Sequence, residues 1–261
     1  MKHPIINCEV ITIQQKIFHP IPMLELPSTK SNPSVCESRE PILNITEIHP
    51  RIYSRSIYFE QQIPNSLQSI YLRQNAYEKL IEAISLLPEE YSFILYDGYR
   101  PLQVQQHLFK LFSDEVRKSH PDFSEDKILE ETLKYVAFPS VEPNKTSPHL
   151  TGGAIDLTLG DKEGNLLDLG SVFDEMSVKS ATRYYEHHPL ENEEALKNRR
   201  LLYNCMTTVG FTNYSEEWWH FDFGNVTWAR RVNSAEAKYG AVKSIIETHQ
   251  IKEYRYYESV Y

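Results

Sequence analysis

The chain has 261 residues, 41% of them hydrophobic, so it can bury one sizeable core, and we expect a single domain. Its 36 acidic and 27 basic residues give a net charge of −9, which disfavours binding to nucleic acids and to anionic membranes. No apolar run could cross a bilayer, the N-terminus lacks a signal-peptide pattern, and the three scattered cysteines form no CxxC pair, so we expect a cytoplasmic protein without disulfides.

A proline-rich segment lies near the N-terminus. Pro20, Pro22, Pro27, Pro33 and Pro41 stand among Ser, Asn and Thr residues. Each proline fixes a backbone angle and removes a hydrogen-bond donor. We therefore expect an extended arm over the core rather than a separate domain.

Apolar residues three or four positions apart predict helices over 74–87, over 101–116 and in the stretch that Ser124 caps. Pro88 ends the first of these helices, and Pro101 suits the first turn of the second. The residues that we expect on buried faces are Val104, Leu108 and Leu111 in the second helix and Leu129, Leu133 and Val136 in the third.

Three short segments are predicted strands, and two of them carry polar motifs. The aromatic and aliphatic residues of 91–96 run into a turn at 97–101, whereas 154–159 and 218–223 alternate apolar with polar residues. A helix over 193–209 separates the last two strands. Helices gathered early in the chain, with strands that bear the polar motifs, indicate an α+β fold.

His149, Asp156 and His220 have the side chains that a zinc site requires. A catalytic zinc takes three protein ligands and keeps one position open for water. His149 and Asp156 are seven residues apart, which would put them on opposite faces of one continuous strand, so a turn must separate them. Gly152 and Gly153 supply this turn, since glycine accepts backbone angles that other residues avoid.

Three further polar residues fit a hydrolytic zinc site. Glu217 is a candidate general base, and its spacing of three from His220 places it in the loop before the strand. Arg100 follows a predicted strand in a turn that contains Gly and Pro, a rigid mount for an electrostatic clamp. Asp222 shares a strand face with His220 and is a candidate partner for its imidazole.

Each of these residues also has a structural explanation. A lone histidine is usually a surface residue or a hydrogen-bonded one, but two glycines and an aspartate nearby favour the metal role for His149. Glu217 alone would be a solvated loop acid, and only its position relative to His220 favours the base. Ser147 and Asp174, taken singly, would be a turn serine and a surface acid.

In this order, the motifs resemble those of zinc D-alanyl-D-alanine dipeptidases of the VanX type. The wider superfamily contains lysostaphin-type endopeptidases, D-alanyl-D-alanine carboxypeptidases and the hedgehog signalling domain. The segments that carry the resemblance are Asp-Gly-Tyr-Arg-Pro at 97–101, Ser-Pro-His-Leu-Thr-Gly-Gly-Ala-Ile-Asp at 147–156, Gly-Ser-Val-Phe-Asp at 170–174, Asn-Arg-Arg-Leu at 198–201 and Glu-Trp-Trp-His at 217–220.

The resemblance covers residues 45–242, which it identifies as a zinc D,D-dipeptidase catalytic domain. It implies a single α+β domain in which a small antiparallel sheet carries the zinc site and helices flank the sheet. Residues 1–44 are then a proline-rich arm, and 243–261 are a C-terminal tail. It also implies one zinc ion per chain and a small dipeptide as the binding partner.

The resemblance assigns a role to each motif residue. The expected reaction is hydrolysis of D-Ala-D-Ala to two D-alanines, by water that zinc activates and a glutamate deprotonates. The implied roles are zinc ligand for His149, Asp156 and His220, general base and later acid for Glu217, transition-state stabilisation for Arg100, receiver of the substrate carboxylate for Ser147 and holder of its ammonium group for Asp174.

Two other functions remain open from the sequence. One is a D,D-carboxypeptidase that acts on murein peptides, and the other, of a different class, is a catalytically silent zinc-containing binding module. The presence of both Glu217 and Arg100 argues against the binding module. The sequence does not distinguish antibiotic resistance from dipeptide salvage, and it leaves the oligomeric state open.

Overall fold

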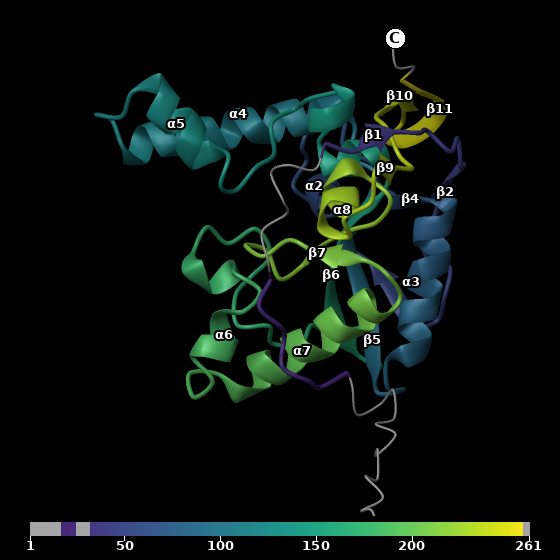
Figure 1. Cartoon of the computed structure of the whole chain (residues 1–261), viewed down its shortest axis with the longest axis vertical. Helices are drawn as coiled ribbons and strands as arrows, with labels where there is room; N and C mark the ends of the chain where they lie inside the picture. The colour runs from purple at the N-terminus through teal and green to yellow at the C-terminus, as the bar shows by residue number, and fades with distance from the viewer. Residues whose placement is uncertain (1–16, 25–31, 258–261) are drawn as a thin grey trace, which may run out of the picture.

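The computed structural model describes residues 17–24 and 32–257. This part of the chain combines helices with a mainly antiparallel sheet, which confirms the α+β class (Figure 1). The helices are α2 (Ile57–Glu60), α3 (Gln74–Leu86), α4 (Leu102–Ser119), α5 (Glu125–Thr132), α6 (Tyr184–His187), α7 (Glu193–Thr208) and α8 (Val226–Arg231), with the short 3-10 helices η1 (Pro143–Lys145), η2 (Pro148–Thr151) and η3 (Val178–Ser180). The strands are β1 (Ser34–Val35), β2 (Ile42–Asn44), β3 (Ile52–Ser54), β4 (Tyr71–Arg73), β5 (Tyr91–Asp97), β6 (Ala154–Asp161), β7 (Thr212–Asn213), β8 (His220–Asp222), β9 (Glu236–Ala237), β10 (Val242–Glu247) and β11 (Gln250–Tyr256).

A five-stranded sheet in the order β3-β5-β6-β8-β7 forms the centre of the molecule. Each neighbouring pair among β5, β6, β8 and β7 is antiparallel, and β3 adds a strand parallel to β5 at the edge. The two long strands form where aromatic and aliphatic residues accumulate, as expected for a sheet buried on both faces. The antiparallel part is the small sheet that we expected to carry the site.

Helices α3 and α7 contact each other and pack on one face of this sheet. Leu80 of α3 and Leu202 of α7 share the main hydrophobic core with Leu157 of β6. Because successive strand residues point to opposite faces, Asp156 and His220 point away from this core. The second face of the sheet is therefore the one that carries the polar side chains.

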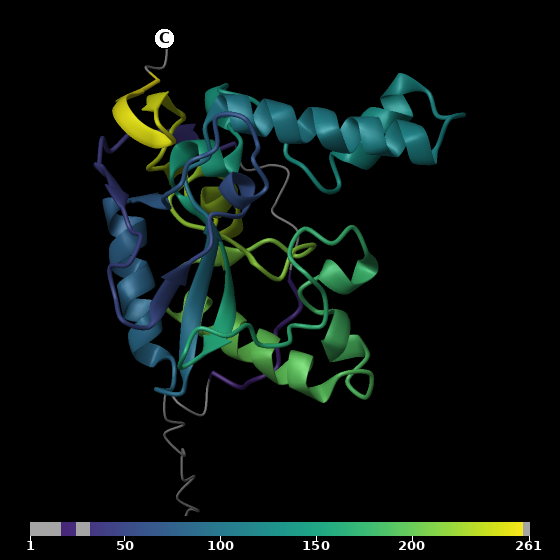
Figure 2. The ribbon, with the colours of Figure 1, turned by 180° about the vertical axis from the view of Figure 1, so that it is seen from behind.

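Helices α4 and α5 form a hairpin that projects from the body (Figures 1 and 2). Ser124 caps α5 as predicted, since its side-chain oxygen accepts the Lys127 N–H at 3.3 Å. Val104 and Leu108 of α4 and Val136 after α5 are buried together, which confirms that part of the predicted stripes. The base of the hairpin is thus anchored in its own small core.

The outer part of the hairpin contradicts the prediction of its apolar faces. Leu111, Leu129 and Leu133 are 45%, 41% and 44% exposed. Ile128 and Thr132 fill the buried side of α5 instead. The physical reason is that a projecting hairpin is covered on one side only, so an apolar stripe wider than the contact between its two helices stays in solvent.

The strand predicted over 218–223 is shorter than expected and spans only His220–Asp222. Trp218 and Trp219 are buried but lie in the turn before β8, where the Trp218 N–H donates to the Ser180 carbonyl at 3.0 Å. The helix prediction over 193–209 is confirmed to within a residue. The shortened strand keeps Glu217 outside the sheet, as predicted.

Both ends of the described chain pack against the sheet domain. In the arm, β1 pairs with β9 and β2 pairs with β4, whereas 1–16 and 25–31 lie outside the described residues. In the predicted tail, β10 and β11 form a hairpin. Tyr99 follows β5, and its hydroxyl donates to the Val242 carbonyl at 3.1 Å.

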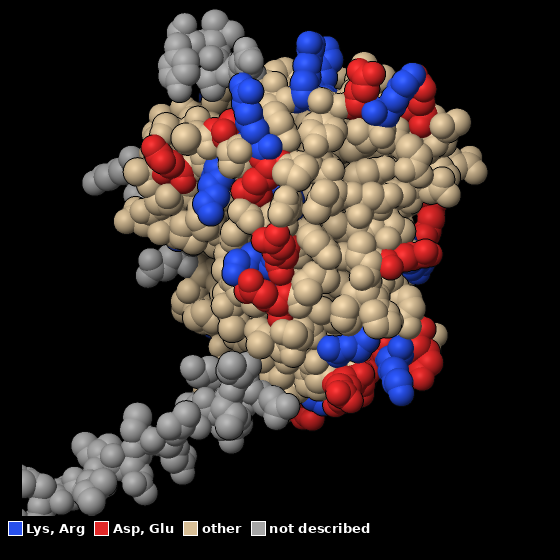
Figure 3. Space-filling view, turned by 90° about the vertical axis from the view of Figure 1, so that its right-hand side faces the viewer, with Lys and Arg blue, Asp and Glu red and all other residues tan. Residues whose placement is uncertain are grey.

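On the face that Figure 3 shows, acidic and basic side chains are interspersed. Within the described residues, no helix has both the length and the apolar character that crossing a membrane requires. Cys36 and Cys205 are free thiols, and Cys8 lies outside the described residues.

Candidate metal centre and cleft

The register of the sheet places two of the expected ligands side by side. Asp156 of β6 lies directly opposite His220 of β8, and Asp97 of β5 lies opposite Asp156 on the other side. Directly opposite residues of neighbouring strands point to the same face. The three side chains therefore form a polar row on the face away from α3 and α7.

His149 reaches this row from η2 rather than from a strand. The turn expected after it is confirmed, since Gly152 has a φ of 71°, in the left-handed region that favours glycine. Gly153 leaves no room for a side chain, because a Cβ there would meet the Phe223 carbonyl oxygen. The turn carries His149 to the same face as Asp156.

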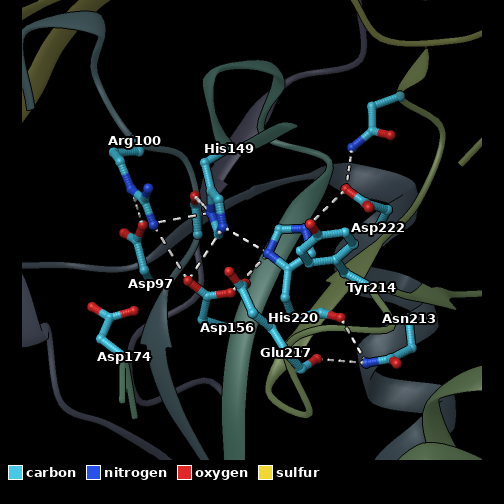
Figure 4. Close-up of polar contacts among 12 residues, drawn as sticks. Asp97, Arg100, His149, Asp156, Asp174, Asn213, Tyr214, Glu217, His220 and Asp222 are labelled. Carbon is cyan, nitrogen blue, oxygen red and sulfur yellow. Dashed lines mark hydrogen bonds and ion pairs between the residues drawn. The ribbon is translucent and has the colours of Figure 1, made fainter. Parts of the chain in front are cut away.

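The ligand atoms of His149, Asp156 and His220 converge (Figure 4). His149 Nε2 lies 3.1 Å from His220 Nδ1 and 3.2 Å from Asp156 Oδ2, and His220 Nδ1 lies 3.0 Å from Asp156 Oδ1. One ligand atom from each residue lies within 4.8 Å of the others. Burial would raise the pKa of Asp156, but the two imidazoles hold it well below its usual range. Two imidazoles and a carboxylate are a donor set that suits a catalytic zinc, so the residues present fit this ion.

Outer partners fix the orientation of both imidazoles. His149 Nδ1 donates to the Gly98 carbonyl at 2.8 Å, which leaves Nε2 with a lone pair for a metal. His220 Nε2 lies 3.3 Å from Asp222 Oδ1, the partner that we expected. The Asn225 side chain donates to the same oxygen at 2.6 Å. These contacts leave the two facing nitrogens free to act as ligands.

Arg100 is buried beside the metal centre, with its guanidinium group held on several sides. Its Nε donates to Asp97 at 2.7 Å, Nη1 to Gln105 at 2.9 Å, and Nη2 to the Tyr58 hydroxyl at 3.2 Å and to Asp156 at 3.3 Å. A guanidinium has five N–H groups, so one on Nη1 is left for a substrate. Burial would lower the pKa of Arg100, but these neighbours raise it above its ordinary value, and the group stays charged.

Asp174 lies beside Arg100 and is linked to it through Tyr58. The Tyr58 hydroxyl donates to Asp174 Oδ2 at 3.0 Å and accepts from Arg100. Burial, followed by the charge of Asp156, raises the pKa of Asp174 to about 7. A carboxylate in such surroundings is stabilised by an incoming cation.

Glu217 lies in the loop before β8, with its side chain directed toward the ligands (Figure 4). Its backbone is held at both ends: the N–H donates to the Tyr214 carbonyl at 3.1 Å, and the carbonyl accepts from the Asn213 side chain at 3.0 Å. Burial raises the pKa of Glu217 to about 8, against the opposing charge of His220. A bound metal cation would favour the ionised form.

Ser147 lines the same cleft but its hydroxyl is already engaged. It donates to the Phe138 carbonyl at 2.6 Å and accepts the Ser140 N–H at 3.3 Å. These bonds close the loop that precedes η2. In this arrangement, the hydroxyl supports the loop that carries His149.

All seven expected site residues line one cleft of about 320 Å³. Helices α4 and α8 and the segment before η2 contribute to its walls, and a second cavity of about 230 Å³ adjoins it and shares Asp174 and Glu217. The structure therefore brings the seven expected site residues together, whereas the motif at 198–201 lines neither cavity.

Sequence reasoning missed several residues of this cleft. Tyr58, Gln105 and Arg230 line it, and the first two bind Arg100. A lone tyrosine, glutamine or arginine outside a motif gives no signal, because its importance depends on contacts between distant segments. Asp97 lay inside a quoted motif, and its position three residues before Arg100 could have indicated the ion pair between them at 2.7 Å.

Comparison with known proteins agrees with the geometry. Residues 57–238 match the family model described as D-ala-D-ala dipeptidase. A D-alanyl-D-alanine dipeptidase of Synechocystis is 31% identical over 180 residues, which cover 62% of this chain and 72% of that protein. A D-alanyl-D-alanine dipeptidase of Escherichia coli K12 is 36% identical over 152 residues, which cover 58% of this chain and 65% of that protein. The match thus spans just under two thirds of the Escherichia coli protein.

Among solved structures, the chain is similar to a mutant of the vancomycin-resistance D,D-pentapeptidase VanY, from the VanB-type cassette, in complex with Zn(II). The two are 14% identical with a TM-score of 0.43, and the alignment covers 81% of this chain and 94% of the other.

Proposed function

The chain belongs to the D-Ala-D-Ala dipeptidase family of zinc peptidases, and we propose that it hydrolyses the D-alanyl-D-alanine dipeptide to two D-alanines. The observation that carries this proposal is the convergence of three zinc-type ligands, a glutamate, an arginine and a second acid in one cleft. A zinc ion held by His149, Asp156 and His220 supplies Lewis-acid activation of water and of the scissile carbonyl.

Glu217 is the general base in this proposal. Its carboxylate is not among the three converging ligands, yet it lines the same cleft and is directed toward them. It takes a proton from the attacking water and later gives it to the leaving amine. The fixed backbone of its loop keeps the carboxylate in place between these two transfers.

Arg100 stabilises negative charge as it develops on the carbonyl oxygen. The contacts to Asp97, Gln105 and Tyr58 fix its guanidinium group, so little reorganisation is needed during the reaction. Its remaining Nη1–H group is the donor available to the substrate.

A dipeptide has a charged group at each end, and Asp174 is the anchor for the ammonium group. Its raised pKa reflects a half-buried carboxylate that lacks a full positive partner. An ammonium group would supply that partner and favour ionisation. This anchor also restricts the substrates to peptides that have a free amino group near the scissile bond.

The direct test is an assay of released D-alanine. Purified protein with zinc should hydrolyse D-Ala-D-Ala, lose activity in chelator and recover when zinc is returned, because the three ligands fit the ion. L-Ala-L-Ala serves as the stereochemical control. Protein that trims a murein pentapeptide but leaves the dipeptide intact would be a D,D-carboxypeptidase instead, and protein inactive on both would refute the proposal.

Replacing Asp174 with Asn should raise KM for D-Ala-D-Ala by about 10- to 100-fold, because a charge-assisted hydrogen bond to the ammonium group is lost. In the parent enzyme, KM should also rise as the pH falls below about 7, where the raised pKa leaves the Asp174 carboxyl protonated. The variant should lack this component of the pH dependence. Both effects can be measured from initial rates between pH 6 and 8.

Glu216→Gln is the matched control, since Glu216 is an exposed acid that lines the adjoining cavity but not the cleft with the ligands. It should leave KM nearly unchanged. N-acetyl-D-Ala-D-Ala has no ammonium group, so any hydrolysis of it should have the same KM in the parent and in Asp174→Asn. An unchanged KM in Asp174→Asn would rule out the anchor.

A further inference from the structure

A dipeptide with its ammonium group at Asp174 must place its carboxylate elsewhere in the cleft, and the following inference rests on the proposed function. Ser147 is the residue that the family resemblance offers for this role. A hydroxyl has one proton, and the Ser147 proton goes to the Phe138 carbonyl at 2.6 Å. A carboxylate only accepts hydrogen bonds, so Ser147 has no donor for it in this arrangement.

Arg230 supplies donors on the same wall of the cleft. It lies on α8, three residues after Thr227, so the two side chains share one helix face, and both line the cleft. The Arg230 Nη2 donates to the Asn144 carbonyl at 2.7 Å, in the segment just before Ser147. This bond fixes the guanidinium group and leaves other N–H groups free.

The pairing of the other cations in the cleft distinguishes Arg230. Arg100 is paired with Asp97, Lys134 with Glu131 at 2.6 Å and Lys145 with Glu142 at 3.1 Å. In 17–24 and 32–257, Arg230 makes no ion pair with an acid. It is therefore the cleft cation whose charge is available to an anionic ligand.

The position of Arg230 complements that of Asp174. Asp174 lies beside Arg100, whereas Asp222 lies beyond His220 on the other side of the ligands (Figure 4). The helix α8 adjoins Asp222, because its N-cap Asn225 donates to that carboxylate at 2.6 Å. The adjoining cavity on the Asp174 side is lined by Glu175 and Glu216 as well as Lys134, whereas Arg230 lines the cleft and not that cavity.

We propose that Arg230, assisted by the Thr227 hydroxyl, binds the C-terminal carboxylate of the dipeptide and makes the site specific for peptides with a free carboxyl end. The guanidinium group matches a carboxylate with two parallel N–H groups. Among the described residues, no ion pair joins Arg230 to Asp222, whose Oδ1 contacts His220 and Asn225.

The test compares D-Ala-D-Ala with D-Ala-D-alaninamide, which lacks the carboxylate, in the parent and in Arg230→Gln. For the free acid, the variant should raise KM by about 10- to 100-fold with little change in kcat, because the lost interaction is a charge-assisted one. For the amide, KM should be similar in both proteins. Arg230→Lys should recover part of the preference for the acid, and Lys145→Gln, which removes a paired cation from the same wall, should have little effect.

The amide separates a substrate contact from a structural role, because Arg230 also holds the Asn144 carbonyl. A loop loosened by the substitution would impair both substrates equally, and that outcome would overturn the inference. So would an unchanged ratio of the two KM values. The proposed function stands whenever the parent hydrolyses D-Ala-D-Ala, whatever the effect of the Arg230 variants. If the parent is inactive, both the proposed function and the inference are refuted.

Discussion

Replacing Glu217 with Gln should lower kcat for D-Ala-D-Ala by about 10²- to 10⁴-fold, the usual contribution of a general acid–base group. Glutamine keeps the size of the side chain but cannot take a proton from water. Because Glu217 is not one of the three converging ligands, the variant should still bind one zinc ion per chain. Turnover and metal content, measured on the same preparation, separate the catalytic role from a structural one.

The stability of the metal-free Glu217 variant provides a second measurement. Burial raises the pKa of Glu217 to about 8, so the fold disfavours its charged form at any pH above the ordinary pKa of a glutamate. The melting temperature of the metal-free Glu217→Gln variant at pH 8 should therefore be no lower than that of the metal-free parent. Glu216→Gln is the control for activity. Loss of zinc from the Glu217 variant, or full activity with zinc bound, would contradict the assignment as base.

The ligands could be predicted from the sequence because their placement depends on local rules. The alternation of 154–159 puts Asp156 on the face opposite the core, and the odd spacing from His149 requires the glycine turn that the structure contains. The same parity places Glu217 in a loop. What spacing alone could not supply was the register between β6 and β8, which sets Asp156 opposite His220.

Other features depend on contacts between distant segments, and no motif or periodicity indicates them. Tyr58 becomes part of the site only because α2 lies beside Arg100 and Asp174. The leucines of α5 have the spacing of a buried face, but the hairpin projects from the body and leaves Leu129 and Leu133 exposed. Periodicity indicates which residues share a face, not whether another layer covers that face.

The N-terminal arm illustrates the same limit, because one of its residues neutralises a charge in the core. Arg73 is fully buried, and both of its terminal nitrogens donate to Glu37 at 2.9 Å. The Arg73 Nε donates to the Thr151 carbonyl at 2.8 Å, at the end of the short helix that carries His149. Glu37 also accepts the Gly240 N–H at 2.8 Å. Glu37 and Gly240 both lie outside the span 57–238 that matches the family model, yet they hold the ligand-bearing turn through Arg73.

Replacing Glu37 with Gln should therefore lower the free energy of unfolding by about 3 kcal/mol, since it leaves a buried guanidinium without its counter-charge. For a chain of this size, the melting temperature should fall by roughly 6–12 °C, measurable by calorimetry of the metal-free protein. Glu60→Gln is the matched control, because its pair with Arg55 is exposed and should contribute less than about 1 kcal/mol. Replacing Arg73 with Met in the Glu37 variant should restore part of the loss, because no unpaired charge is then left in the core. Equal melting temperatures for Glu37→Gln and Glu60→Gln would show that the arm does not stabilise the domain through this pair.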